Sequence, residues 1–273
     1  MKTAPPLDLI STAERNRIRE FYDGGEASRW GRAALPELRA QIQVLIDHYL
    51  APADRLVELG CGQGALEGIH PRYVGLDLSR RALQKFFSPT TPRVQASMEE
   101  LPLRSAAVGM VVSVAALEHV PRPERCLEEI ARVLRPGGLL YLAPAWFCRP
   151  WAARGLHVRS FRELRWRDRV EKLTLPLRNH LLFRAVGIFP QRLWSELEWR
   201  ARHRPLPFRY RRLQPNLNQH ITSDSDAFVS MDPHRAILFF LSRGYDIVSA
   251  PGFWRRFTVR HLPVVVRKPT VDV

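Results

Sequence analysis

Apolar runs of strand length alternate with segments of helical period through the first half of the chain. The runs predict strands at 55–60, 73–77, 108–114 and 139–143, and the segments between them predict helices from about Gly64, over 80–87 and over 126–134. The run at 108–114 is apolar over nearly its whole length, which is typical of a strand buried on both faces. Strands that alternate with helices in this way favour a parallel α/β sheet.

Both ends of the chain also predict regular structure. The patterns predict helices at 12–21, 36–50 and 233–243 and strands at 245–248 and 257–267. Ser11, with Glu14 three residues later, forms a capping box for the first helix, and Gly244 ends the last one.

The segment 145–230 follows no such alternation. Pro190 is expected to open an amphipathic helix within it. Residues 216–230 are polar and loop-like, and they contain Asp224 and Asp226 close together. This acidic pair favours a turn, with a metal or sugar site as the alternative.

Composition limits the class of protein. The chain has 273 residues, of which 45% are hydrophobic, and this is enough for a full core. No apolar run approaches the roughly 20 residues of a membrane span, and no signal peptide is recognised at the start. Cys61, Cys126 and Cys148 show neither disulfide nor metal spacing. Together these features predict a cytoplasmic protein.

Charge is distributed unevenly. The formal net charge is +15, and the basic residues are 38 Arg and 4 Lys. The segment 151–220 holds 16 basic and 5 acidic residues, so it carries +11 of that charge. A clustered basic surface attracts membrane headgroups, phosphates or nucleic acid.

Candidate chemistry begins at a glycine-rich turn. Gly60, Gly62 and Gly64 follow the first predicted strand, with Glu58 two residues ahead of the first glycine. Glycine allows a tight turn and leaves room for a ligand against the backbone. The second predicted strand ends in Asp77, and an acid at that position can accept hydrogen bonds from both hydroxyls of a ribose.

The stretch from Glu58 to Gly64 resembles motif I of the class I S-adenosylmethionine (SAM) methyltransferases. Leu-Glu-His-Val at 117–120 resembles the small-molecule branch that includes ubiquinone and menaquinone methyltransferases. Glu-Ile-Ala-Arg-Val-Leu-Arg-Pro-Gly-Gly at 129–138 is the strongest local match. The resemblance covers 55–144. It implies a Rossmann-like seven-stranded sheet, mostly parallel, with an antiparallel edge hairpin and SAM as the cofactor.

The resemblance also implies the cofactor site. Its residues would be Glu58, Gly60, Gly62, Gly64, Asp77, Leu78, Ser97, Met98 and Ala115. Asp77 would bind the ribose, and the backbone N–H of Met98 would reach an adenine nitrogen. Ser97 stands where the family commonly has an aspartate for the adenine amino group, so this chain brings a hydroxyl without a charge to that contact.

Residues for the acceptor are less well defined. His119 is a candidate base or substrate anchor, with a structural helix-cap role beside Glu118 as the alternative. Glu118, Trp146 and Trp151 are candidate substrate contacts, and no metal site is expected. The resemblance suggests a lid ahead of the glycine turn, with Tyr22, Arg29 and Trp30 as candidates and with ordinary packing and solvent contacts as the alternative for all three.

These expectations divide the chain into four parts. Residues 1–54 would form N-terminal helices and a lid, and 55–144 the SAM-binding core. Residues 145–230 would be a basic, largely helical, Arg- and Trp-rich insertion after the fifth strand, for recognition of the substrate or a membrane. Residues 231–273 would complete the core.

The predicted function is transfer of a methyl group from SAM to an oxygen or carbon of a small-molecule or lipid-linked acceptor, such as a glycan or a quinone-like ring. No Asn/Asp-Pro-Pro-Tyr tetrapeptide follows 108–114, and no Pro-Cys pair stands there, which argues against DNA methylation. Two alternatives stay open: an RNA methyltransferase that uses the basic segment, and a non-catalytic SAM-binding module. Contact with a membrane surface through 151–220 is expected ahead of contact with nucleic acid.

Overall fold

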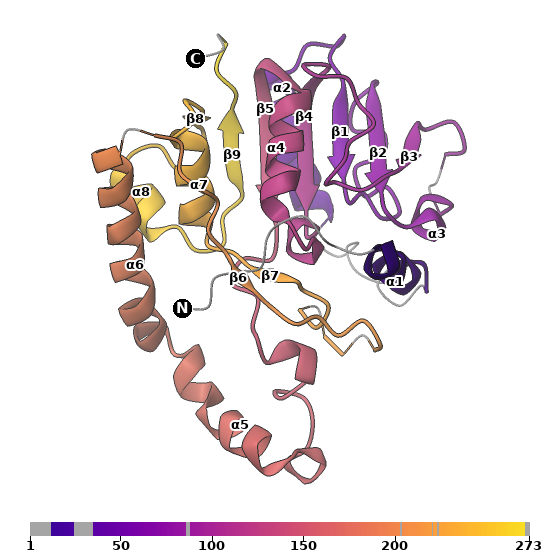
Figure 1. The fold of residues 1–273 in the computed structure, drawn as a ribbon. Helices are drawn as coiled ribbons and strands as arrows, with labels where there is room; N and C mark the ends of the chain where they lie inside the picture. Colours follow the sequence, from indigo (N-terminus) through magenta and orange to yellow (C-terminus); the bar gives the residue numbers. More distant parts are fainter. Residues whose placement is uncertain are drawn as a thin grey trace.

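The computed structural model describes residues 12–24, 35–85, 88–202, 204–219, 221–222 and 224–270 (Figure 1). A seven-stranded sheet has the order β3-β2-β1-β4-β5-β9-β8. Its strands are β1 Leu56–Leu59, β2 Tyr73–Asp77, β3 Arg93–Gln95, β4 Val108–Val114, β5 Leu134–Ala143, β8 Asp246–Ile247 and β9 Val264–Arg267. The first five are parallel, and β9 pairs antiparallel with β5 and β8. The sheet predicted from the sequence is confirmed.

Helices cover both faces of this sheet. They are α1 Thr12–Asp23, α2 Leu35–Tyr49, α3 Arg80–Leu83, α4 Pro123–Val133, α7 Pro233–Leu241 and α8 Phe253–Thr258. Along β4, Val111 packs in the same core as Ile130 of α4, whereas Met110 packs in a second core with Ile42 of α2. The alternation of β4 side chains between two cores explains why the strand is apolar on both faces.

Two long helices follow β5 and a short 3₁₀ region. They are α5 Trp166–Asn179 and α6 Leu181–Arg202, and a two-stranded ladder of β6 Arg211–Arg212 with β7 Val229–Ser230 comes after them. In Figure 1, α5 extends beyond the edge of the sheet at which the parallel strands end, while α6 runs back toward α7 and α8. None of the helices described is both long enough and apolar enough to cross a membrane.

Buried ion pairs join α6 to the end of the chain. The Arg192 guanidinium is 2% exposed and donates to both Asp232 oxygens, at 3.0 and 2.7 Å, and to the Val259 carbonyl at 2.7 Å. Glu196, one turn later, pairs with the Arg256 guanidinium at 2.7 Å and lies 3.1 Å from His234 Nε2. These contacts fix the second half of α6 against α7 and α8.

The helix predicted after the glycine turn is absent. Residues 62–72 form tight turns instead, with i to i+3 hydrogen bonds such as Glu67 N–H to the Gly64 carbonyl at 3.1 Å. Gly64 and Gly68 have φ of +79° and +76°. A right-handed helix needs negative φ at every residue, so two left-handed glycines four positions apart prevent one.

Other boundaries predicted from the sequence were also wrong, among them the start of the strand predicted at 139–143, which begins at Leu134. The helix predicted to open at Pro190 begins at Leu181, so Pro190 lies in its interior. The helix predicted at 80–87 ends at Leu83 and is followed by a turn at 84–85, while 86–87 lie outside the described residues. The start of the strand predicted at 257–267 is helical instead, because Phe253 and Phe257 stack one turn apart in α8, with ring centroids 5.2 Å apart.

Candidate active site

A cavity of about 1910 Å³ opens at the carboxyl edge of the parallel strands. Its walls come from the turns after β1 and β2, from 95–102, from 114–122 and from α1. In open α/β sheets this edge is where ligands bind, because the loops that leave neighbouring strands diverge there. The cavity is the candidate site.

The glycine turn forms one wall, and its glycines serve different purposes. Gly60 has φ of +70°, and a Cβ there would lie 2.3 Å from the Ala116 Cβ, so the fold itself excludes a side chain. Gly62 has φ of +53°, and nothing lies within 4 Å of a Cβ built on it. The backbone at Gly62 is therefore open to a ligand.

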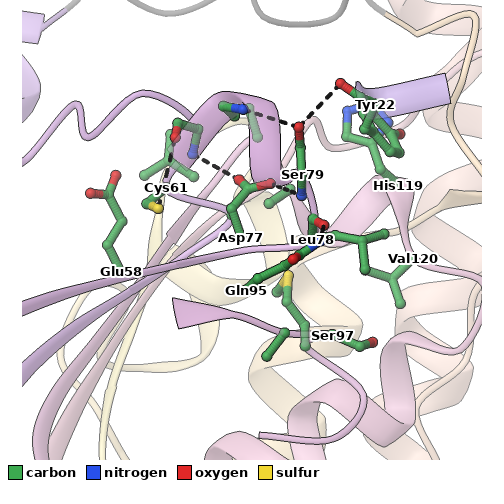
Figure 2. Close-up of a pocket in the computed structure, with 18 of the residues that line it drawn as sticks. Tyr22, Glu58, Cys61, Asp77, Leu78, Ser79, Gln95, Ser97, His119 and Val120 are labelled. Carbon is green, nitrogen blue, oxygen red and sulfur yellow. Dashed lines mark hydrogen bonds between the residues drawn. The ribbon is translucent and has the colours of Figure 1, made fainter. Parts of the chain in front are cut away.

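Asp77 lies at the centre of this wall. One carboxylate oxygen accepts from Gly62 N–H and the other from Ser79 N–H, each at 2.8 Å (Figure 2). Burial raises the pKa of the Asp77 carboxyl, and the hydrogen bonds from Ser79, Gly62 and Leu78 oppose that shift. Each oxygen keeps a lone pair for a further donor, so Asp77 can still accept from a vicinal diol.

Glu58 is held away from Asp77, on the far side of the turn (Figure 2). It accepts from the Tyr73 hydroxyl at 2.5 Å and from Leu66 N–H at 3.3 Å. Burial raises its pKa to about 7, although the bonds from Tyr73 and Leu66 lower it. Its contacts in the structure are with the fold: Glu58 ties the turns after Gly62 to β2.

The opposite wall carries Ser97 and Met98. The Ser97 hydroxyl accepts from Glu99 N–H at 3.2 Å, and its own hydrogen remains available to a ligand acceptor. Met98 is 8% exposed and packs into the core beneath. Leu78 bridges toward this wall through its carbonyl, which accepts from Gln95 Nε2 at 3.1 Å.

Ala115 lies where β4 meets the cavity. Its φ is +47°, a conformation that residues other than glycine rarely adopt. Its N–H donates to the Ala143 carbonyl at 3.0 Å, so the pairing of β4 with β5 holds the strained residue. Such strain clusters at functional sites.

A polar cluster from three distant parts of the chain closes one end of the cavity. Tyr22 of α1 donates to Asp226 Oδ2 at 3.0 Å, and His119 Nδ1 lies 3.3 Å from the same oxygen. The Tyr22 and His119 rings meet edge to face, with centroids 6.0 Å apart. Burial and the neighbouring Asp226 raise the pKa of the Tyr22 hydroxyl well above its usual value.

Glu118 supports this cluster from below. It is 1% exposed, and its Oε1 accepts from Ala145 N–H at 3.0 Å and lies 3.7 Å from His119 Nε2. Burial raises the pKa of the Glu118 carboxyl, and the nearby His119 opposes the shift. Glu118 lines the cavity and also fixes the backbone after β5.

The tryptophans proposed as substrate contacts lie outside this cavity. Trp146 is buried in the sheet core, and its Nε1 donates to the Leu262 carbonyl at 3.2 Å. Trp151 packs in a small separate core with Leu156, Leu164 and Leu175. Arg29 and Trp30, named as lid residues, lie outside the described residues.

Sequence reasoning missed the link between Tyr22 and Asp226. The acidic pair at 224–226 was interpreted as a turn, and the two partners are 204 residues apart. No local pattern could join them. Within the part of the chain that the structure describes, no group of three or more His, Cys, Asp or Glu side chains could hold a metal ion.

The site fits the parts of SAM. An acceptor pair at Asp77 suits the ribose, and the uncovered backbone at Gly62 leaves room for the amino-acid portion. A model of the methyltransferase domain matches residues 57–142. Residues 57–142 therefore match a methyltransferase domain, and about half of the chain is similar to SAM-dependent methyltransferases.

Curated relatives agree with this assignment. The chain is 30% identical over 151 residues to the ubiquinone/menaquinone biosynthesis C-methyltransferase UbiE of Syntrophotalea carbinolica, covering 51% of this chain and 56% of the relative. It is 34% identical over 150 residues to a "Probable S-adenosylmethionine-dependent methyltransferase" of Mycobacterium tuberculosis, covering 52% and 50%. The match spans about half the length of these relatives.

A third relative and two solved structures complete the comparison. The phthiotriol/phenolphthiotriol dimycocerosates methyltransferase 1 of Mycobacterium ulcerans is 34% identical over 103 residues, covering 34% of this chain and 38% of the relative. A SAM-dependent methyltransferase from Mesorhizobium loti has a TM-score of 0.35 at 28% identity, covering 44% and 57%. A chain of the complex between the Haloferax volcanii Trm112 methyltransferase activator and a methyltransferase has a TM-score of 0.45 at 18% identity, covering 92% and 97%.

Proposed function

We propose that this protein transfers a methyl group from SAM to an oxygen or carbon of a small-molecule or lipid-linked acceptor. The observation that carries the proposal is one cavity that joins the Gly62–Asp77 corner to the Tyr22–His119–Asp226 cluster. Its volume of about 1910 Å³ exceeds the roughly 300–1,000 Å³ of common small-molecule sites. It therefore has room for a cofactor and an acceptor together.

The chain would hold the cofactor through four contacts. Asp77 would accept from the ribose hydroxyls, and the turn at Gly62 would receive the amino-acid portion. Ser97 and the Met98 N–H would face the adenine. SAM supplies an electrophilic methyl group on a sulfonium, so the protein has to place the acceptor in line with it and exclude water.

His119 would remove or accept the acceptor proton. His119 Nδ1 lies 3.3 Å from Asp226 Oδ2 and its Nε2 lies 3.7 Å from Glu118 Oε1, so two carboxylates flank the imidazole. Asp226 is then a positioning residue for the imidazole. Tyr22 closes the cluster from α1 and keeps solvent from it.

Two further parts of the chain complete the proposal. Residues 1–54 would act as a lid, supported by Ser79 Oγ, which donates to Asp23 of α1 at 2.8 Å beside the cofactor corner. Residues 145–230 would be an insertion in the methyltransferase sheet that supplies Asp226 and recognises the acceptor or a membrane. Two relatives, a ubiquinone/menaquinone biosynthesis C-methyltransferase and a phthiotriol/phenolphthiotriol dimycocerosates methyltransferase, support an acceptor of this kind.

Calorimetric titration of SAM and its demethylated product tests the cofactor site. We expect micromolar binding to the wild type and a loss of at least about 100-fold in Asp77→Ala, since a bonded charged acceptor would be removed. Asp246→Ala, at an exposed position of β8, is the matched control and should bind as the wild type does. No binding to the wild type would refute the proposal.

The same protein then tests the role of His119. Candidate acceptors can be screened for uptake of a labelled methyl group from SAM. With an acceptor found in this way, His119→Asn should keep its affinity for the cofactor and lose about 10²–10⁴-fold in turnover. Unchanged turnover at every pH would remove His119 from the mechanism while leaving the cofactor site intact.

A further inference from the structure

An apolar stripe runs along the exposed side of α5. Trp166, Val170, Leu173 and Leu177 follow the spacing i, i+4, i+7, i+11, which places them on one side of a helix. Trp166 and Leu173 are each 70% exposed, and the other two are more than half exposed. A soluble surface does not normally place four large apolar side chains in register.

A second stripe continues on α6. Leu182, Val186, Leu193 and Leu197 recur at helical spacing, and their exposed fractions run from 49% to 76%. Each helix is attached to the rest of the molecule at a defined place. Leu175 anchors α5 to Trp151 in its small core, and Arg192 anchors α6 through Asp232. The exposed sides are therefore surfaces of anchored helices.

The surroundings of the α5 stripe are strongly basic. The acids of this region are already paired: Arg154 binds Asp168 and Glu171, each at 2.6 Å. Exposed arginines at 162, 165 and 167 stand beside or within the start of α5, and the Arg167 guanidinium lies 5.3 Å above the Trp166 ring. With 151–220 carrying +11, the stripe faces its partner with excess positive charge.

We propose that the α5 stripe, extended by the α6 stripe, inserts into the interface of an anionic lipid bilayer. Apolar side chains with a tryptophan at one end suit the acyl boundary, and the flanking arginines suit the headgroups. Two copies of this chain would bring like charge against like charge, which opposes a dimer through the same face. RNA offers no counterpart to a row of leucine and valine.

The orientation deepens the proposed function. In Figure 1, α5 projects beyond the same sheet edge at which the cavity opens, so a docked α5 brings that edge toward the bilayer. A lipid-linked acceptor could then reach the cavity without leaving the membrane. This last step rests on the proposed methyl transfer, whereas docking itself does not.

Vesicle sedimentation of the full chain tests the docking. We expect binding to vesicles of 70% phosphatidylcholine and 30% phosphatidylserine, and weak binding to phosphatidylcholine alone. A double variant with Trp166→Ser and Leu173→Ser should lower the partition coefficient at least about tenfold. Val44→Ser is the control, because Val44 is 67% exposed on α2, away from both stripes. It should bind as the wild type does.

Other outcomes would overturn the proposal. One is that the wild type does not bind vesicles, and another is that the double variant binds them as well as the wild type does. A third is that the wild type forms a dimer that the double variant does not form, and that neither protein binds vesicles. Binding to RNA but not to vesicles would also refute it. Circular dichroism checks that the double variant is folded. The sedimentation assay contains no SAM, so it tests docking alone. If the protein bound vesicles but transferred no methyl group in a later assay, only the proposed function would be refuted.

Discussion

At the cavity, the buried carboxylate of Glu58 and the partly buried carboxylate of Asp77 are held by backbone N–H groups and a tyrosine hydroxyl. Between α6, α7 and α8, the carboxylates of Glu196 and Asp232 each pair with an arginine guanidinium. Burial raises the pKa of Glu58 to about 7. Burial also acts to raise the pKa of Glu196, but Arg256 and His234 lower it to about 2.

This difference in the partners of the carboxylates distinguishes a ligand site from a structural contact between helices. A carboxylate that is held by dipoles keeps lone pairs and can change its protonation or its partner when a ligand arrives. A carboxylate that is fixed by a buried guanidinium loses far more if its partner goes than it gains from any ligand. The carboxylates at the cavity can therefore change partners when a ligand binds. The ion pairs of Arg192 with Asp232 and of Glu196 with Arg256, here called the α6 junction, hold the helix that carries the exposed α6 stripe.

Removing the Arg192 guanidinium from the α6 junction should give the largest loss of stability. Arg192→Met leaves Asp232 without its guanidinium and the Val259 carbonyl without its donor. We expect the free energy of unfolding to fall by about 3–5 kcal/mol, because an uncompensated charge stays in a buried place. Denaturant titration of both proteins measures the difference.

Arg178→Met is the matched control for that experiment. Arg178 also pairs with a carboxylate, Glu171, at 3.1 Å, but its side chain is 41% exposed. Loss of a solvated pair should cost less than about 1 kcal/mol. Equal losses of unfolding free energy in the two variants would mean that the Arg192 pair contributes no more to stability than a surface ion pair does.

The second prediction compares the pH dependence of the two regions. Because the pKa of Glu58 is raised, the folded protein binds more protons than the unfolded chain between about pH 4.5 and 7. Its contribution to stability is present below pH 4.5 and is lost as the pH rises to 7. Glu58→Gln should therefore gain stability relative to the wild type over that window, by at most about 3 kcal/mol.

Glu196→Gln should behave in the opposite sense. The lowered pKa of Glu196 contributes stability above about pH 4.5 that is lost as the pH falls toward 2. The variant should be least stable, relative to the wild type, near neutral pH and should approach it in acid. Denaturant midpoints from pH 3 to 8 measure both curves, and parallel curves for the two variants would contradict the comparison.

Much of the sheet could be predicted from the sequence. The strands at 73–77 and 108–114 have the bounds that their apolar runs indicated. The order of motifs also indicated the cavity edge, because glycines and Asp77 follow neighbouring strands. These features are local, and local patterns are visible in one dimension.

What failed needed three dimensions. Pro190 has helix-opening chemistry, yet α6 begins at Leu181 and the proline lies in its interior. Trp146 is of a residue type that often contacts ligands, yet its indole is buried in the sheet core. The partnership of Tyr22 with Asp226 depends on where α1 and the loop before β7 come to lie, which no spacing reports.

Two neighbouring glycines of the turn after β1 should separate an effect on folding from an effect on binding. Gly60→Ala puts a Cβ 2.3 Å from that of Ala116 at a φ of +70°, and we expect a loss of roughly 2–3 kcal/mol. Gly62→Ala meets nothing within 4 Å at a φ of +53°, so only the left-handed backbone costs, about 1 kcal/mol.

Cofactor titration should reverse that order. The methyl group of Gly62→Ala projects toward the space where a ligand would lie against the turn, so SAM affinity should fall at least about tenfold in a protein that is nearly as stable as the wild type. Gly60→Ala, measured where it is folded, should lose less affinity, because its clash is with Ala116 inside the fold. If Gly62→Ala bound SAM normally, the cofactor would have to lie elsewhere in the cavity, and the responsive carboxylate at Asp77 would lose its proposed ligand.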